Sequence, residues 1–290
     1  MLLLQLLING VQVGALYALI AVGFSLIFGS TKVFHFAHGS TFTIAAYVFY
    51  YVYSVAQMHW LLAVLAATLA AVMLGVLLDR LVYAPIQRHE GSFFTVFVAS
   101  LGMGIIVQNL VGMIFGRGFV SVSTPLSRSV ELFPGLYVSP LSGIAIVCAL
   151  VFFGALQLFL MRTHVGMGLR ALSENPELVR VYGLSPRRLS TIVFALGSLL
   201  AVPAAILSAA SSGLNPAVAH HVMLISLAAT IVGGVGSLRG AACAGLLLGM
   251  SENLALMYLG PQWSEAVTFI VLFFFIVLRP SGFFGRAIST

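Results

Sequence analysis

Residues 162–190 read RTHVGMGLRALSENPELVRVYGLSPRRLS and form the longest densely charged interval in a chain of otherwise apolar runs. Five of the chain's twelve arginines lie within it. Asn175 can cap a helix that begins at Pro176, where the missing N–H costs nothing, and Glu177 lies where the helix dipole favours an anion. Gly183 is suited to end this helix. The interval therefore predicts a short charged helix between two apolar segments.

The predicted short helix is expected to present a docking surface. Val179 and Tyr182 are three residues apart and share one face, while Arg180 points elsewhere. The helix would then offer an apolar patch ringed by charge, with Arg170 and Glu174 just before it. Such a surface suits contact with another protein better than it suits catalysis.

The composition defines the class of the whole chain. Of its 290 residues, 61% are hydrophobic and 7% are charged, whereas soluble domains have about a quarter charged residues. The apolar runs are continuous and about twenty residues long, which excludes the alternating strands of a membrane barrel. We therefore expect an all-α, polytopic transmembrane bundle that forms one transmembrane domain over residues 1–290.

The apolar runs predict nine membrane spans, each about long enough to cross the hydrocarbon core. The run 222–238 ends in glycines and could be re-entrant, so eight crossings are the alternative. The expected spans are 3–28, 33–56, 60–78, 92–115, 140–161, 189–210, 222–238, 241–259 and 264–279. The polar segments 79–91 and 116–139 between them are expected to be an inner loop and an outer loop. Either loop could contact a partner or serve as a solvated connector.

The basic residues indicate the orientation of these spans. With the N-terminus outside and the C-terminus cytoplasmic, eleven basic residues fall inside and only Arg117 and Arg128 fall outside, which is the bias of membrane proteins. Those inside are Lys32, Arg80, Arg88, Arg162, Arg170, Arg180, Arg187, Arg188, Arg239, Arg279 and Arg286. The net charge of +6 thus reflects membrane topology, not nucleic-acid binding, and residues 162–190 are expected to be cytoplasmic.

Small residues at four-residue spacing predict close helix packing. Gly10 and Gly14 have this spacing in the first span. A second glycine group contains Gly233, Gly234, Gly236 and Gly240. This second group does not form a phosphate-binding loop, because such a loop ends in a lysine and the chain's only lysine is Lys32.

A few polar residues within the apolar runs are candidates to line a substrate path, by depth alone. They are Gln12, His38, Gln108, Asn109 and Glu252. A carboxylate deep in a membrane costs several kcal/mol unless it is paired or protonated, so Glu252 is expected either to line the path or to hold helices together. His35 and His38 have no third ligand nearby, and we expect no metal site.

Several motifs resemble the permeases of ABC importers for branched-chain amino acids. Glu177, followed six residues later by Gly183, has the spacing of the importers' coupling-helix signature. Further segments similar to this family's motifs occur in family order along the chain. They are Phe36-Ala37-His38-Gly39 with His35 in place of asparagine, Tyr83-Ala84-Pro85, Asn175-Pro176-Glu177, Gly233 to Gly240 with Arg239 in place of proline, and Pro280 to Arg286.

The resemblance implies a transport subunit that is not an enzyme, binds no cofactor and works in a bacterial inner membrane. Its implied partners are a second permease, related or identical, two cytoplasmic ATPase subunits that bind ATP-Mg, and a periplasmic or lipid-anchored substrate-binding protein. The residues implied to meet the ATPases are Arg170, Glu174, Pro176, Glu177, Arg180, Tyr182 and Gly183. Membrane lipid surrounds such a subunit, and nucleic acid is not among its partners.

Two alternatives stay open at the level of sequence. An ion- or proton-coupled secondary transporter of amino acids would use Glu252 as its titrating group and would not need a cytoplasmic docking helix. Within the resembled subfamily, a permease for urea or short amides would have the same motifs. A membrane enzyme would need a catalytic constellation, and the sequence offers none.

Overall fold

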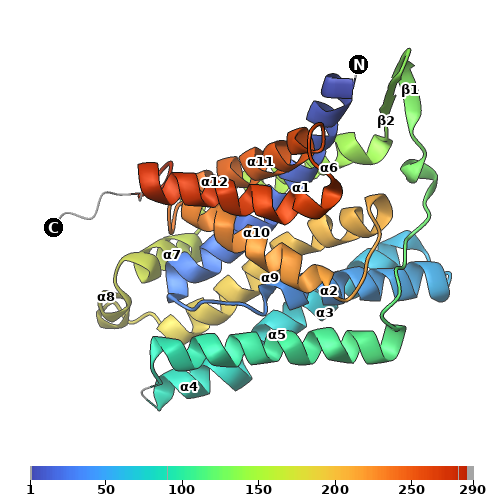
Figure 1. The fold of residues 1–290 in the computed structure, drawn as a ribbon. Helices are drawn as coiled ribbons and strands as arrows, with labels where there is room; N and C mark the ends of the chain where they lie inside the picture. The colour runs from blue at the N-terminus through green and yellow to red at the C-terminus, as the bar shows by residue number, and fades with distance from the viewer. Residues whose placement is uncertain (1, 90, 280, 286–290) are drawn as a thin grey trace.

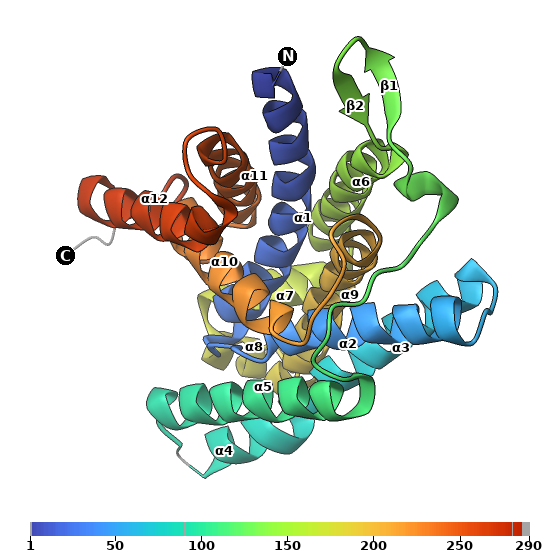
Figure 2. The same ribbon diagram turned by 45° about the vertical axis from the view of Figure 1, so that its right-hand side comes forward.

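Helix α1 (Leu2–Thr31) runs through the centre of a helical bundle (Figures 1 and 2). The structure is a computed structural model that describes residues 2–89, 91–279 and 281–285. In the most apolar part of α1, 72% of the residues are buried, against 22% in α5 (Phe93–Phe115) and 17% in α6 (Pro140–Arg162). Helix α1 is therefore the core around which the other helices pack, which agrees with the expected all-α membrane fold.

The remaining elements follow in chain order around α1. The first half contains α2 (His38–Tyr50), the π-helix η1 (Tyr51–Val55), α3 (Trp60–Leu77), the π-helix η2 (Leu78–Tyr83) and α4 (Ala84–Arg88). Between α5 and α6 come the short 3₁₀ helix η3 (Pro125–Ser127) and the strands β1 (Val130–Phe133) and β2 (Leu136–Val138). The second half contains α7 (His164–Glu174), α8 (Pro176–Val181), α9 (Pro186–Ser211), α10 (Val218–Gly233), α11 (Leu238–Ala255), the 3₁₀ helix η4 (Pro261–Trp263) and α12 (Ser264–Leu278).

Fewer helices meet a strict length test for a membrane span than the sequence predicts. In the described ranges, α1, the continuous helix Trp60–Arg88, α5, α6 and α9 are long and apolar enough, and α10 with α11 adds a sixth if the bent pair is one span. Helix α2 begins at His38, later than expected, and α12 has 15 residues. The eight or nine crossings and the orientation of the termini stay predictions. Pro280 and Arg286 of the C-terminal motif lie outside the described residues.

The polar segment 79–91 is not the loop that the sequence predicts, and its contact with a partner stays a prediction. Its first ten residues continue the helix of α3 through η2 and α4, so that one helix extends over Trp60–Arg88. Asp79 and Tyr83 are buried, with 3% and 1% of their surfaces exposed. The expectation is wrong because these two polar side chains find hydrogen-bond partners inside the bundle, as described below.

The glycine-rich end of the run 222–238 is where the chain bends. Helices α10 and α11 meet at an angle of 120° across a short break. Gly234 and Gly236 in this break have φ values of +97° and +81°, which side-chain-bearing residues rarely adopt. These two glycines therefore form a turn, whereas the sequence assigned them only to helix packing.

The other predicted packing glycines do lie at crowded helix contacts. A Cβ atom at Gly14 would lie 2.8 Å from the carbonyl oxygen of Leu246, and one at Gly10 would lie 3.0 Å from Cα of Met250. A Cβ at Gly240 would lie 1.9 Å from the carbonyl oxygen of Gly233. The small residues therefore allow α11 to approach α1 and α10 at backbone distance.

The segment 116–139 ends in the two-stranded hairpin β1–β2, which lies beside the N-terminal end of α1 (Figure 2). Gln5 of α1 fixes it, because its Nε2 donates to the carbonyl oxygen of Tyr137 at 2.7 Å and its Oε1 accepts from the N–H of Tyr137 at 2.9 Å. Val120 forms a further isolated bridge with Leu214. This segment is thus held to the bundle at both of its ends.

Candidate coupling surface and transport path

Helices α7 and α8 form a small unit at one end of the bundle, away from the β-hairpin (Figure 1). The N-cap is the one predicted: Oδ1 of Asn175 accepts hydrogen bonds from the N–H groups of Glu177 at 2.9 Å and Leu178 at 3.2 Å. At the other end, Gly183 has φ +75°, and the N–H of Leu184 donates to the carbonyl oxygen of Val179 at 3.1 Å. Local sequence alone therefore defines both ends of α8.

The exposed face of α8 is not the face that its spacing predicts. Val179 is buried, with 1% of its surface exposed, while Val181 and Tyr182 are 79% and 80% exposed and Leu178 is 53% exposed. Val179 anchors the helix to the bundle, so the expectation that it shares an exposed face with Tyr182 is wrong. The apolar patch that faces outward consists of Leu178, Val181 and Tyr182.

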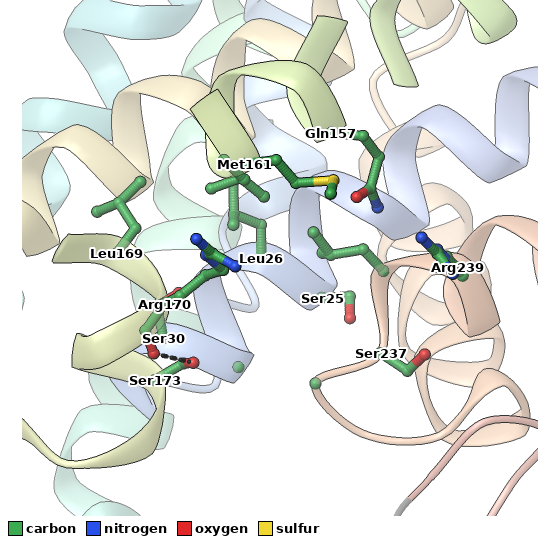
Figure 3. A pocket seen from close by; sticks show the side chains of 14 residues that line it. Ser25, Leu26, Ser30, Gln157, Met161, Leu169, Arg170, Ser173, Ser237 and Arg239 are labelled. Carbon is green, nitrogen blue, oxygen red and sulfur yellow. Dashed lines mark hydrogen bonds between the residues drawn. The ribbon is translucent and has the colours of Figure 1, made fainter. Parts of the chain in front are cut away.

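All seven residues expected to couple to ATPases are exposed, but they do not share one surface. Pro176 and Arg180 line a cavity of about 530 Å³ between α8, α4 and the end of α1. Arg170 lines a separate cavity of about 380 Å³ (Figure 3). Of the expected set, only Tyr182 belongs to the outward apolar patch. Glu174, Glu177 and Gly183 are exposed but belong neither to this patch nor to the two cavities.

Asp79 joins two segments at the same end of the bundle. Its Oδ1 accepts from the hydroxyl of Ser190 at 2.8 Å, and its Oδ2 accepts from the hydroxyl of Thr191 at 2.7 Å. The carboxylate thereby ties η2 to the first turns of α9, which directly follows α8. Sequence reasoning placed Asp79 in a loop, although it is the only aspartate of the chain and directly follows an apolar run.

The two histidines of the second predicted span are fully buried at the start of α2. Nδ1 of His35 lies 2.9 Å from the hydroxyl of Tyr83, and Nε2 of His38 lies 3.2 Å from the carbonyl oxygen of Ile20. Throughout the described ranges, no three His, Cys, Asp or Glu side chains are grouped to hold a metal ion. His38, a candidate for the substrate path, is packed against α1.

Glu252 lies in a hydrogen-bonded chain that joins α1, α10, α11 and α12. Its Oε2 accepts from the hydroxyl of Tyr17 at 2.9 Å, and its Oε1 accepts from the hydroxyl of Thr268. The Tyr17 hydroxyl also lies 3.2 Å from Nε2 of His221, whose Nδ1 is 3.3 Å from Glu265. Only 4% of Glu252 is exposed, and this geometry fits the helix-holding role foreseen as one of two options.

The remaining path candidates have different surroundings. Oε1 of Gln12 accepts from the hydroxyl of Ser142 on α6 at 2.5 Å. Gln108 lines a cavity of about 110 Å³ beside Ser40, while its neighbour Asn109 is exposed. These candidates therefore do not form one site within this chain, and their role in a substrate path stays a prediction.

Several participants in these contacts were not foreseen from the sequence, among them Thr268 and the three other partners around Glu252. The hydrogen-bond network around Glu252 is completed by Tyr17, His221 and Glu265, which are far apart in sequence. Glu265 had a weak signal, because it is an acid in the first turn of an apolar helix. Tyr17 had none, since a tyrosine in an apolar run is ordinarily a packing residue.

These features define a helical, multi-span membrane protein with a short capped helix at one end. The family model for the permease component of branched-chain amino acid transport systems matches residues 6–276. The chain therefore belongs to this permease family.

Named relatives match the chain over nearly its whole length. It is 31% identical to the high-affinity branched-chain amino acid transport system permease protein BraD of Pseudomonas aeruginosa, over 98% of this chain and 96% of BraD. It is 28% identical to the permease protein LivH of Escherichia coli K12, with the same coverage. The probable LivH of Methanocaldococcus jannaschii is 26% identical, over 93% of this chain and 89% of that protein.

A solved structure has a similar fold. The structure described as PsaBC from Streptococcus pneumoniae in complex with Fab aligns with a TM-score of 0.52 and 13% identity. The alignment covers 96% of this chain and 90% of that chain. At this identity the match supports the helical fold, whereas the family rests on the sequence relatives.

Proposed function

We propose that this chain is the membrane permease subunit of an ATP-driven importer for branched-chain amino acids in a bacterial inner membrane. The observation that supports the ATP-driven mechanism is the exposed patch Leu178, Val181 and Tyr182 on α8. These apolar groups lie on a short helix within the charged interval 162–190, which carries five arginines, and a protein partner would cover them favourably.

Energy enters this subunit from outside, because the sequence carries no phosphate-binding loop. Two cytoplasmic ATPase subunits bind ATP-Mg and close against α8 and its counterpart on a second permease. Val179, the buried residue of α8, transmits the movement into the bundle. A periplasmic or lipid-anchored binding protein delivers the substrate on the opposite side.

Asp79 provides a second route for this movement. The first turns of α9 directly follow α8, and their hydroxyls hold the Asp79 carboxylate of η2. A displacement of α8 therefore pulls on the long helix Trp60–Arg88 as well as on α7. We propose that this contact makes the two helical segments move together when the transporter switches between outward and inward access.

The test is Tyr182→Asp in proteoliposomes that contain the permease, its ATPases and its binding protein, with leucine uptake and ATP hydrolysis recorded together. We expect both uptake and stimulated hydrolysis to fall at least tenfold. Tyr137→Asp is the matched control, because Tyr137 is also exposed but lies on the β-hairpin at the other end. Leucine uptake and stimulated hydrolysis of the control should equal those of the wild type.

A second candidate function is proton-coupled secondary transport of amino acids. It is favoured by the hydrogen-bonded series of titratable side chains that runs from Glu265 through His221 and Tyr17 to Glu252. The same vesicles separate the two functions. Leucine uptake that needs no ATPase, follows a proton gradient and disappears in Glu252→Gln would replace the importer with this carrier.

A further inference from the structure

A cavity of about 380 Å³ opens beside the end of α1 near α7 (Figure 3). One wall comes from the end of α6 and from α7, and it includes Arg170 and Gln157. The opposite wall is the turn between α10 and α11 with the first residues of α11, and it includes Ser237 and Arg239. Its volume is within the usual range for small-ligand sites, about 300–1,000 Å³.

The charged side chains that line the cavity are all positive. Two arginines face the cavity from opposite walls, and the fourteen described residues that line it include no carboxylate. Figure 3 shows the Arg170 and Arg239 side chains on either side of the opening, with Ser25 between them. Among the described residues, neither guanidinium forms an ion pair with a carboxylate. Two unneutralised guanidinium groups favour an anion.

Ser25 adds an independent indication of a ligand. Its side chain is fully buried in the wall of the cavity, and within the described residues its hydroxyl has no hydrogen-bond partner. A buried hydroxyl without a partner costs about 1–3 kcal/mol. Thr230 is left in the same way, but Ser25 differs because it lines a cavity that can hold the missing partner. A bound group with acceptor oxygens would satisfy this donor.

The backbone of the α10–α11 turn contributes to the same site. Ser237 caps α11, and its hydroxyl accepts from the N–H of Gly240 at 3.1 Å. The first turn of α11 therefore presents the positive end of an 18-residue helix beside Arg239. The turn lies against α1, since a Cβ atom at Gly29 would lie 3.1 Å from Cα of Gly236.

We propose that this cavity binds a small oxyanion, a carboxylate or a phosphate, between Arg170 and Arg239 with Ser25 as a further donor. The carboxylate of an amino acid, free phosphate and a phospholipid head group share this chemistry. The inference is independent of the proposed function, because binding needs neither ATP nor transport.

The test is equilibrium binding to the full chain in phosphatidylcholine nanodiscs, with labelled leucine, labelled inorganic phosphate, and leucinamide as a probe without a carboxylate. Thermal stability in nanodiscs containing phosphatidylglycerol tests the lipid source. We expect leucine, phosphate or the anionic lipid to bind and leucinamide not to compete. Arg239→Gln should weaken the binding about tenfold or more, as expected for a lost charged hydrogen bond.

Ser25→Ala is the second variant, because it removes a hydroxyl that has no described partner and is not expected to impair folding. It should weaken binding severalfold while the melting temperature stays the same or rises. Arg162→Gln is the charge-matched control, since Arg162 is exposed on the last turn of α6 and does not line the cavity. The proposal is overturned if no oxyanion probe binds, or if both cavity variants bind as the wild type does.

Discussion

Thr268→Val tests whether Glu252 holds helices together. Thr268 is buried on α12, and its hydroxyl donates to the Glu252 carboxylate on α11. Valine has nearly the shape of threonine without the hydroxyl, so the substitution removes this hydrogen bond and leaves no large cavity. Tyr17→Phe does the same for the 2.9 Å bond from α1.

The size of the effect follows from burial and charge. Hydrogen bonds between membrane helices contribute about 0.6 kcal/mol on average and up to about 1.7 kcal/mol, and bonds to charged groups contribute about 1.5–3 kcal/mol. Because only 4% of Glu252 is exposed, we expect the upper part of the membrane range, about 1.5 kcal/mol for each variant. At about 2–4 °C per kcal/mol, the melting temperature should fall by about 3–6 °C.

The assay is thermal unfolding of the purified protein in detergent, followed by intrinsic fluorescence. Thr230→Val is the matched control, because Thr230 is also buried and its hydroxyl has no partner in the part of the chain that the structure describes. It should leave the melting temperature unchanged or raise it. If Thr268→Val melts like the wild type but abolishes leucine uptake, the helix-holding role is refuted and Glu252 belongs to the substrate path.

Three further substitutions test the packing and the coupling end. Asp79→Leu leaves the Ser190 hydroxyl without its acceptor and the Thr191 hydroxyl with only the carbonyl oxygen of Arg187, and should destabilise the protein by about 1–3 kcal/mol, measured by gel filtration after heating. Gly249→Leu should prevent monodisperse folding, because a Cβ there already lies 2.3 Å from the N atom of Gly14, whereas Gly154→Leu, which has open space, should fold normally. Asn175→Ala removes the cap of α8, worth about 1 kcal/mol, and should lower stimulated ATP hydrolysis more than basal hydrolysis.

Features that depend on neighbouring residues could be predicted from the sequence. The cap at Asn175 and the end at Gly183 follow from side-chain and backbone chemistry within one turn. The apolar runs identify the membrane class, and the spacing of Gly10 and Gly14 identifies a close helix contact. These signals need no knowledge of what lies across the bundle.

Features that depend on distant partners could not be predicted. Asp79 is buried because its carboxylate accepts hydrogen bonds from two hydroxyls that lie more than a hundred residues later in the chain. Its segment is therefore helical, although its polar residues predicted a loop. Val179 points inward because a helix of six residues takes its orientation from its neighbours, not from its own pattern. The path candidates were chosen by depth alone, and depth does not determine which side chains meet.

The central position of α1 has a consequence for how the protein is made. Its most extensive contact is with α11, which begins more than two hundred residues later in the chain. At a synthesis rate of about 5–20 residues per second, α1 waits roughly 10–40 s in the bilayer before α11 leaves the ribosome. During this interval Gly10 and Gly14 face lipid or another helix. Helices α6 and α9 can pack on α1 during this interval, but the glycine face of α1 has to stay unoccupied until α11 arrives.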